Sequence, residues 1–139
     1  MRETLADMSS RKLVTSLKRL SKGLLQTRYG ESSSDPWHTF SAPYDASPLT
    51  VASFKKAMRL PDGPEGELRE ESVEEFFESM RESEDAPRYA ALRELISREL
   101  KQVKIFLSSS EEVVEGRVYL CGVAADGKIV GLWAIRVWT

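Results

Sequence analysis

The stretch "GRVYLCGVAADGKIVGLWAIRVWT", residues 116–139, decides the fold. It predicts two strands, 116–124 and 128–139, joined by a hairpin turn at 125–127, because Asp-Gly between apolar runs is a strong turn signal. Side chains of a strand alternate between the two faces of its sheet. In the last strand both sets are largely apolar: one is Ile129, Trp133, Ile135 and Val137, and the other is Val130, Leu132, Ala134, Arg136 and Trp138. We therefore expect both faces of the sheet to be covered.

The cover is expected to come from helices. Apolar spacing predicts four of them, at 10–22, 50–59, 73–80 and 87–101, and a first strand of the final sheet at 103–107. Gly23 is a natural helix stop, Ser72 a cap and Pro87 a first-turn residue. A loop before Pro36 leads into a short extended segment anchored by Trp37 and Phe40. The pattern predicts one domain, 1–139, of α/β (α+β) class: a three-layer α/β/α sandwich with a small, mainly antiparallel sheet.

The composition narrows the classes of function that this chain can have. The 139 residues are 41% hydrophobic and 30% charged, with a formal net charge of −2, which argues against a dedicated nucleic-acid binder. No run of about 20 apolar residues predicts a membrane span. The N-terminal residues lack the apolar centre of a secretory signal. An organelle transit peptide is an alternative there, but the same residues make a good structural helix.

The sequence offers little for catalysis. Its single cysteine, Cys121, lies in an apolar run and is expected to be a buried small hydrophobe. Its single histidine, His38, is expected to be a polar residue with a structural partner, although a Cys–His hydrolase is the competing interpretation. We find no metal-ligand cluster, phosphate-binding loop or nucleophile elbow. We therefore expect neither an enzyme nor a cofactor.

A set of residues in a fixed order resembles a known family. The set comprises "GLL" at 23–25, an acidic serine-containing loop with Glu31 before Pro36, Phe40, the pair Phe76-Phe77, and the final hairpin with Gly122, Gly127, Gly131 and a terminal threonine. This pattern resembles the nuclease A inhibitor family, small bacterial proteins that inhibit a magnesium-dependent, sugar-non-specific nuclease. The resemblance runs from about Leu17 to Thr139.

The resemblance implies a mechanism. In that family the inhibitor blocks the nuclease active site, the terminal threonine reaches the catalytic magnesium, and a loop glutamate approaches the metal; the matching positions are Thr139 and Glu31. Trp138, Asp35 and Trp37 are expected in the same partner-binding region. The chemistry is reasonable, since Mg²⁺ prefers oxygen ligands and Thr139 offers a hydroxyl and a carboxylate. The implied partner is the nuclease protein, with no metal of the chain's own, no direct nucleic acid and no membrane. We expect a cytoplasmic protein that is monomeric when free.

Alternatives stay open. Thr139 can be an ordinary strand end, and Glu31 a solvated loop acid. Asp35 stands where the family has an aromatic residue, Trp138 where it has an acid, and the loop around Glu31 is longer. A diverged member that binds another, unknown protein is thus the second interpretation. Residues 65–85 carry ten acids against two arginines, a charge excess that would attract the basic cleft of a nuclease or serve only as a solvated surface.

Overall fold

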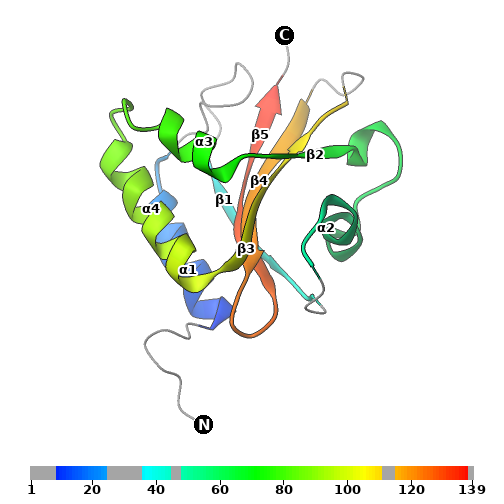
Figure 1. The fold of residues 1–139 in the computed structure, drawn as a ribbon, viewed down its shortest axis with the longest axis horizontal. Coiled ribbons are helices and arrows are strands. Elements are labelled where there is room, and N and C mark those ends of the chain that lie inside the picture. The colour runs from blue at the N-terminus through cyan, green and yellow to red at the C-terminus, as the bar shows by residue number, and fades with distance from the viewer. Residues whose placement is uncertain (1–8, 25–35, 45–47, 111–114, 138–139) are drawn as a thin grey trace.

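The computed structural model describes residues 9–24, 36–44, 48–110 and 115–137. These residues form four α-helices and five strands, and the last three strands follow one another at the end of the chain (Figure 1). The helices are α1 (Ser10–Ser21), α2 (Val51–Met58), α3 (Val73–Ser79) and α4 (Ala86–Glu99), with a short 3₁₀ turn at Pro64–Gly66. The strands are β1 (His38–Ala42), β2 (Leu68–Glu71), β3 (Lys101–Ser108), β4 (Glu115–Val123) and β5 (Ile129–Val137). The predicted α+β class is confirmed.

All strand pairs are antiparallel, in the order β1-β5-β4-β3-β2. The final hairpin therefore forms the middle of the sheet, with β5 between β4 and β1. Its turn is closed by hydrogen bonds from the Ala124 N–H to the Lys128 carbonyl and from the Gly127 N–H to the Ala124 carbonyl. Gly127 has φ +87°, a conformation that favours glycine. The predicted hairpin and its turn are confirmed.

Two strands differ from the sequence prediction. The segment at 38–42 was expected only as an extended stretch, and it is the edge strand β1. The strand β2 was not predicted at all, because its four residues, "LREE", carry three charges and a single apolar side chain. It becomes a strand because it pairs with β3 at the edge of the sheet, and an edge strand tolerates charged side chains.

Helices lie on both faces of the sheet, as the two apolar faces of β5 predicted. In Figure 1, α1, α3 and α4 lie on one side of the strands and α2 on the other. The larger core cluster joins the three-helix side to Val130, Leu132 and Ala134 of β5. The smaller cluster joins Phe54 of α2 to the opposite face, which carries Ile129. Because α2 has only eight residues, it covers only part of that face.

Helix ends follow the sequence signals. The Ser9 hydroxyl accepts from the Lys12 N–H at the start of α1, and Gly23 follows its end with φ +82°. The Arg88 guanidinium of α4 donates to the Leu20 carbonyl at 3.2 Å and to that of Lys22, so it caps the last turn of α1. In the part of the chain that the structure describes, no helix combines the length and apolarity that a bilayer span needs.

Candidate partner interface

Strand ends converge at one end of the sheet. The described part of β5 ends at Val137, which pairs with Glu115 at the start of β4. Nearby, β1 begins with His38 opposite Trp133. β3 ends with Ser108, whose hydroxyl accepts from the Arg117 N–H at 2.8 Å. The described residues next to the predicted site segments therefore lie at the same end of the molecule (Figure 1).

Four of the five predicted site residues lie outside the described residues: Glu31, Asp35, Trp138 and Thr139. Their roles stay predictions. The structure places residues close to them in sequence. Val137, two residues before Thr139, is the last residue of β5. Pro36, which directly follows Asp35, lies just before β1.

Trp37 is the fifth predicted site residue, and it lies in the core. Its side chain is 6% exposed and belongs to the larger core cluster. The indole N–H donates to the Tyr89 hydroxyl of α4 at 3.0 Å, and the ring meets Phe76 of α3 edge-on, with 6.0 Å between centroids. Burial raises the pKa of Tyr89, so its hydroxyl is neutral. Trp37 thus fixes the start of β1 to the helices, and its burial leaves little of the ring for a partner.

The strand that leads to the C-terminal residues is held on both sides. Residues Ile129–Trp133 of β5 pair with β1, and the whole of Ile129–Val137 pairs with β4. The last described residues of β5, 134–137, pair with β4 alone. The described part of β5 is thus an ordered strand as far as Val137.

Cys121 and His38 do not form a catalytic pair. The Cys121 side chain is fully buried, and burial raises the pKa of its thiol, which keeps it protonated and unreactive. The His38 ring is exposed on β1 and stacks on Trp133 at 4.4 Å between centroids. Within the described ranges, no three His, Cys, Asp or Glu side chains come together as a metal site. The expected burial of Cys121 is confirmed.

The comparison with protein families decides the identity. Residues 11–139 match the profile of the family described as "Nuclease A inhibitor-like protein". The chain belongs to this nuclease A inhibitor-like family. A search of curated proteins finds no match. The resemblance inferred from the final hairpin and the upstream motifs is thus confirmed over nearly the whole chain.

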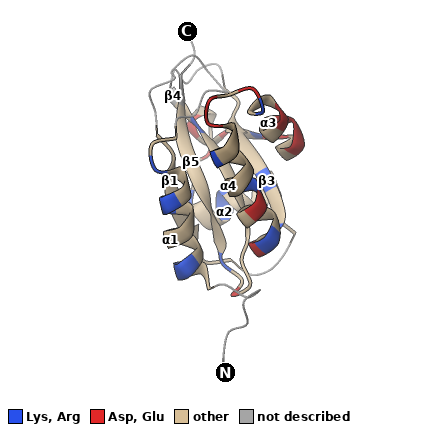
Figure 2. Ribbon diagram, turned by 90° about the vertical axis from the view of Figure 1, so that its left-hand side faces the viewer, with Lys and Arg blue, Asp and Glu red and all other residues tan. Residues whose placement is uncertain are grey.

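The charge of this nuclease A inhibitor-like protein is unevenly distributed. Figure 2 shows acidic residues on and beside α3 and basic residues along α1. Among the acids of β2 and α3, the described ion pairs neutralise three: Glu70 with Lys104, Glu71 with Arg69, and Glu78 with Arg81. The other seven of the ten acids in 65–85 form no ion pair with a described residue. The acidic excess predicted from the sequence is therefore retained in the fold.

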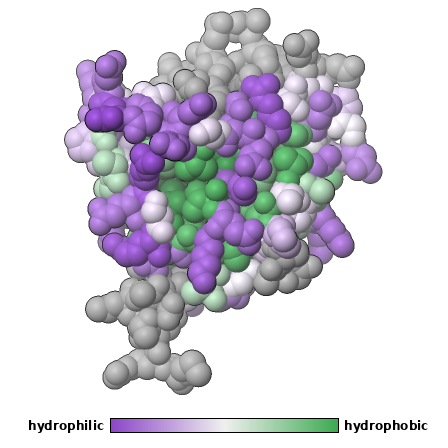
Figure 3. Space-filling view, viewed as in Figure 1, coloured by the Kyte–Doolittle hydropathy of each residue, from purple (hydrophilic) through white to green (hydrophobic). Residues whose placement is uncertain are grey.

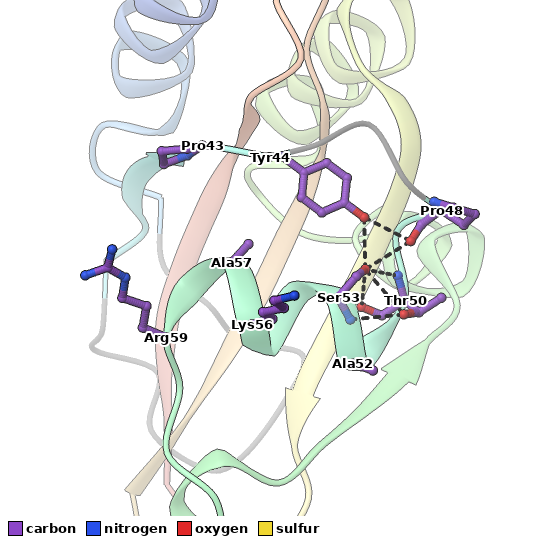
Figure 4. A pocket seen from close by; sticks show the side chains of 9 residues that line it. All are labelled: Pro43, Tyr44, Pro48, Thr50, Ala52, Ser53, Lys56, Ala57 and Arg59. Atoms are coloured by element: carbon purple, nitrogen blue, oxygen red, sulfur yellow. Dashed lines mark hydrogen bonds between the residues drawn. The ribbon is translucent and has the colours of Figure 1, made fainter.

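One surface hollow is formed by described residues beside α2. It lies between the segment after β1 and α2, and it is lined by Pro43, Tyr44, Pro48, Thr50, Ala52, Ser53, Lys56, Ala57 and Arg59 (Figure 4). The Tyr44 hydroxyl lies 2.9 Å from both the Pro48 carbonyl oxygen and the Ser53 hydroxyl oxygen, so its polar groups already serve the start of α2. These lining residues include no acid and no imidazole. Figure 3 shows an apolar area within a hydrophilic rim on the face seen in Figure 1.

Sequence reasoning missed one arrangement on β5. Trp133 lies between His38 of β1 and Arg117 of β4, whose guanidinium carbon is 4.1 Å from the indole centroid. The hairpin turn and strand alternation could have placed Arg117 near Trp133 on one face. His38 required the pairing of β1 with β5, between residues about 95 positions apart, for which no local signal exists.

Proposed function

We propose that this protein inhibits a magnesium-dependent, sugar-non-specific nuclease by binding over its active site, with the C-terminal residue reaching the catalytic metal. Family membership over residues 11–139 is the observation that carries the proposal. The same membership favours a non-enzymatic role. The protein is further proposed to be cytoplasmic, and monomeric when it is not bound to the nuclease.

The metal in this mechanism belongs to the nuclease. Mg²⁺ needs oxygen ligands in near-octahedral geometry and keeps several waters, so a compact group with two kinds of oxygen can replace the substrate phosphate. Thr139 carries a carboxylate and a hydroxyl close together. Glu31 supplies a second carboxylate, for a metal-held water or for a basic residue that binds phosphate during catalysis. Asp35 and Trp138 are proposed as further contacts around these two.

Two features of the described residues support this mechanism. The first is the pairing of β5, with β1 and β4 up to Trp133 and with β4 alone up to Val137, which limits the entropy lost when the strand is immobilised on a partner. The second is the acidic surface around β2 and α3 (Figure 2), because a nuclease that binds DNA presents a basic cleft and opposite charges raise the association rate.

The test alters the C-terminus. Thr139 is deleted in one variant, and in another a Gly-Ser-Gly-Ser extension follows it; each is titrated against a purified magnesium-dependent, sugar-non-specific nuclease. The proposal expects at least a tenfold loss of inhibition in both, whereas the same extension placed before Met1 leaves inhibition unchanged. Full inhibition by both C-terminal variants would exclude the metal-reaching role of Thr139.

A second candidate function is a protein-binding module with a different partner. It is favoured by the sequence departures at Asp35 and Trp138, which lie in the proposed contact region. The titration separates the two candidates, because this second function predicts that the wild-type chain does not inhibit the nuclease at any concentration.

A further inference from the structure

Three side chains form an ordered layer on the α2 side of the sheet. The His38 ring stacks on Trp133 with an interplanar angle of 29°, and the Arg117 guanidinium lies over the same indole. His38 and Arg117 come from the two strands that flank β5, so the indole lies between them. Both are exposed, and Trp133 is half-buried. We refer to these three residues as the tryptophan layer.

The tryptophan layer borders the part of the sheet face on which α2 packs. Phe54 is the fully buried side chain of α2 on this face, and its ring meets Phe40, Phe106 and Tyr119. Arg117 pairs across the hairpin with Ile135, one row closer to the end of β5 than the row of Trp133 and Tyr119. Trp133 and His38 therefore lie in the row where the contacts of Phe54 end, and Arg117 lies one row closer to the end of β5.

The chemistry of the layer selects its ligand. The His38 ring and the Arg117 guanidinium both lie against the indole of Trp133, which leaves less of it for a nucleobase to stack on. The Arg117 side chain hydrogen-bonds Tyr119 and takes part in no ion pair with a described side chain, so its remaining planar N–H donors match a carboxylate. Stacking also restricts the Arg117 side chain before any partner arrives, which reduces the cost of immobilising it. Buried Trp and Arg side chains are frequent among the residues that dominate binding energy.

We propose that the tryptophan layer is a second contact surface for the same nuclease, and that Arg117 binds a carboxylate on the nuclease surface. The inference rests on the proposed function, because the layer is continuous with the strand that leads to Thr139. The acids of α3 lie on the opposite side of the sheet, because α3 packs through Phe76 and Phe77 into the larger core cluster. The Arg117 guanidinium and the acids of α3 thus lie on opposite sides of the sheet, which favours one orientation of a bound partner.

The experiment measures binding of the full chain to a purified magnesium-dependent, sugar-non-specific nuclease. Arg117→Glu is expected to weaken binding at least tenfold, mainly through faster dissociation, because it places like charges together. Arg117→Lys is expected to retain part of the affinity, since the charge stays and the planar stack is lost. The matched control is Arg19→Glu, an equal charge reversal on the exposed face of α1, with an expected change below threefold. His38→Gln, which leaves Arg117 in place, is expected to weaken binding about two- to fivefold.

The outcomes separate the two proposals. If the wild-type chain binds and inhibits the nuclease while Arg117→Glu and His38→Gln bind as tightly as wild type, the tryptophan layer is no contact surface and the proposed function stands. If the wild-type chain does not bind, both proposals are overturned. Circular dichroism of each variant verifies the fold. If the Arg19→Glu control loses as much affinity as Arg117→Glu, the loss is a general effect of charge and the proposed contact at Arg117 is overturned.

Discussion

Asp126, in the turn of the final hairpin, accepts a hydrogen bond from the backbone N–H of Ser10 at 3.0 Å, across 116 positions of sequence. The turn thereby caps the first helix and ties α1 to the sheet. Partial burial by itself raises the pKa of Asp126, but hydrogen bonds from the Ser10 hydroxyl, the Ser10 N–H and the Lys128 N–H outweigh it, and the net pKa is lowered. A charged carboxylate is therefore preferred in the folded state.

The first prediction concerns the pH dependence of this cap. A lowered pKa in the folded state stabilises the protein above the unfolded pKa of about 3.9, and the stabilisation is lost as the pH falls through the folded pKa. Asp126→Asn is expected to lower the free energy of unfolding by about 0.3–1 kcal/mol at pH 7, the range for a charge at an exposed helix start. Urea unfolding between pH 7 and pH 3 should show this difference shrinking. Asp62→Asn, at an exposed loop acid, is the control, and a pH-independent difference would contradict the assignment.

The second prediction concerns the buried hydrogen bond between Trp37 and Tyr89. Tyr89→Phe keeps the ring but leaves the Trp37 indole N–H without its acceptor in the core. We expect a loss of about 1–3 kcal/mol in the free energy of unfolding, measured by urea titration. Tyr44→Phe is the matched control, because the Tyr44 hydroxyl lies in a part-exposed site where water can replace it. A loss for Tyr89→Phe no larger than that of the control would remove the anchoring role of this pair.

The third prediction tests the close packing of the hairpin. A Cβ at Gly131 would lie 2.2 Å from the Leu120 carbonyl oxygen and 2.6 Å from the Cys121 Cβ. Gly131→Ala therefore forces the two central strands to shift, and we expect a loss of about 1–3 kcal/mol in thermal or urea unfolding. Gly127→Asn in the turn is the comparison, since nothing lies within 4 Å of its Cβ position and asparagine tolerates the left-handed conformation. Equal stability of the two variants would show that the close approach of β4 and β5 at Gly131 does not require glycine.

The fold could be predicted from the sequence wherever the signal was local. The apolar side chains on both faces of 129–137 predicted an inner strand with both faces covered, and helix spacing with Gly23, Ser72 and Pro87 placed the helix ends within one or two residues. In contrast, β2 carries no apolar alternation, and only its pairing with β3 makes it a strand. The helices follow from signals in their own sequence, whereas an edge strand such as β2 depends on the neighbouring strand with which it pairs.

The residues of the candidate site were likewise predictable where the signal was local and not where it depended on distant segments. The expected burial of Cys121 followed from its apolar neighbours. Trp37 was expected both as an apolar anchor and in the partner-binding region. Its burial confirms the anchor, and its indole donates to the Tyr89 hydroxyl on α4, 52 positions away, which no local pattern reveals. The tryptophan layer likewise combines a short-range pair set by the hairpin register with a long-range contact from β1. Contacts between distant segments are therefore what the sequence alone could not supply.

The fourth prediction concerns the acidic surface. Glu82 and Glu84 are exposed acids in the segment between α3 and α4, and neither forms an ion pair with a described residue. If the surface attracts the nuclease, the double variant Glu82→Gln/Glu84→Gln is expected to associate about two- to fivefold more slowly at low ionic strength, with little change in dissociation. Stopped-flow mixing at several salt concentrations measures both rates, and the difference should shrink near 0.5 M salt because the charges are screened. The control, Arg11→Gln/Lys18→Gln on α1, removes two exposed charges of opposite sign and should not slow association. Equal slowing in both variants, or a slowing that persists at high salt, would mean that the acids do not steer the encounter.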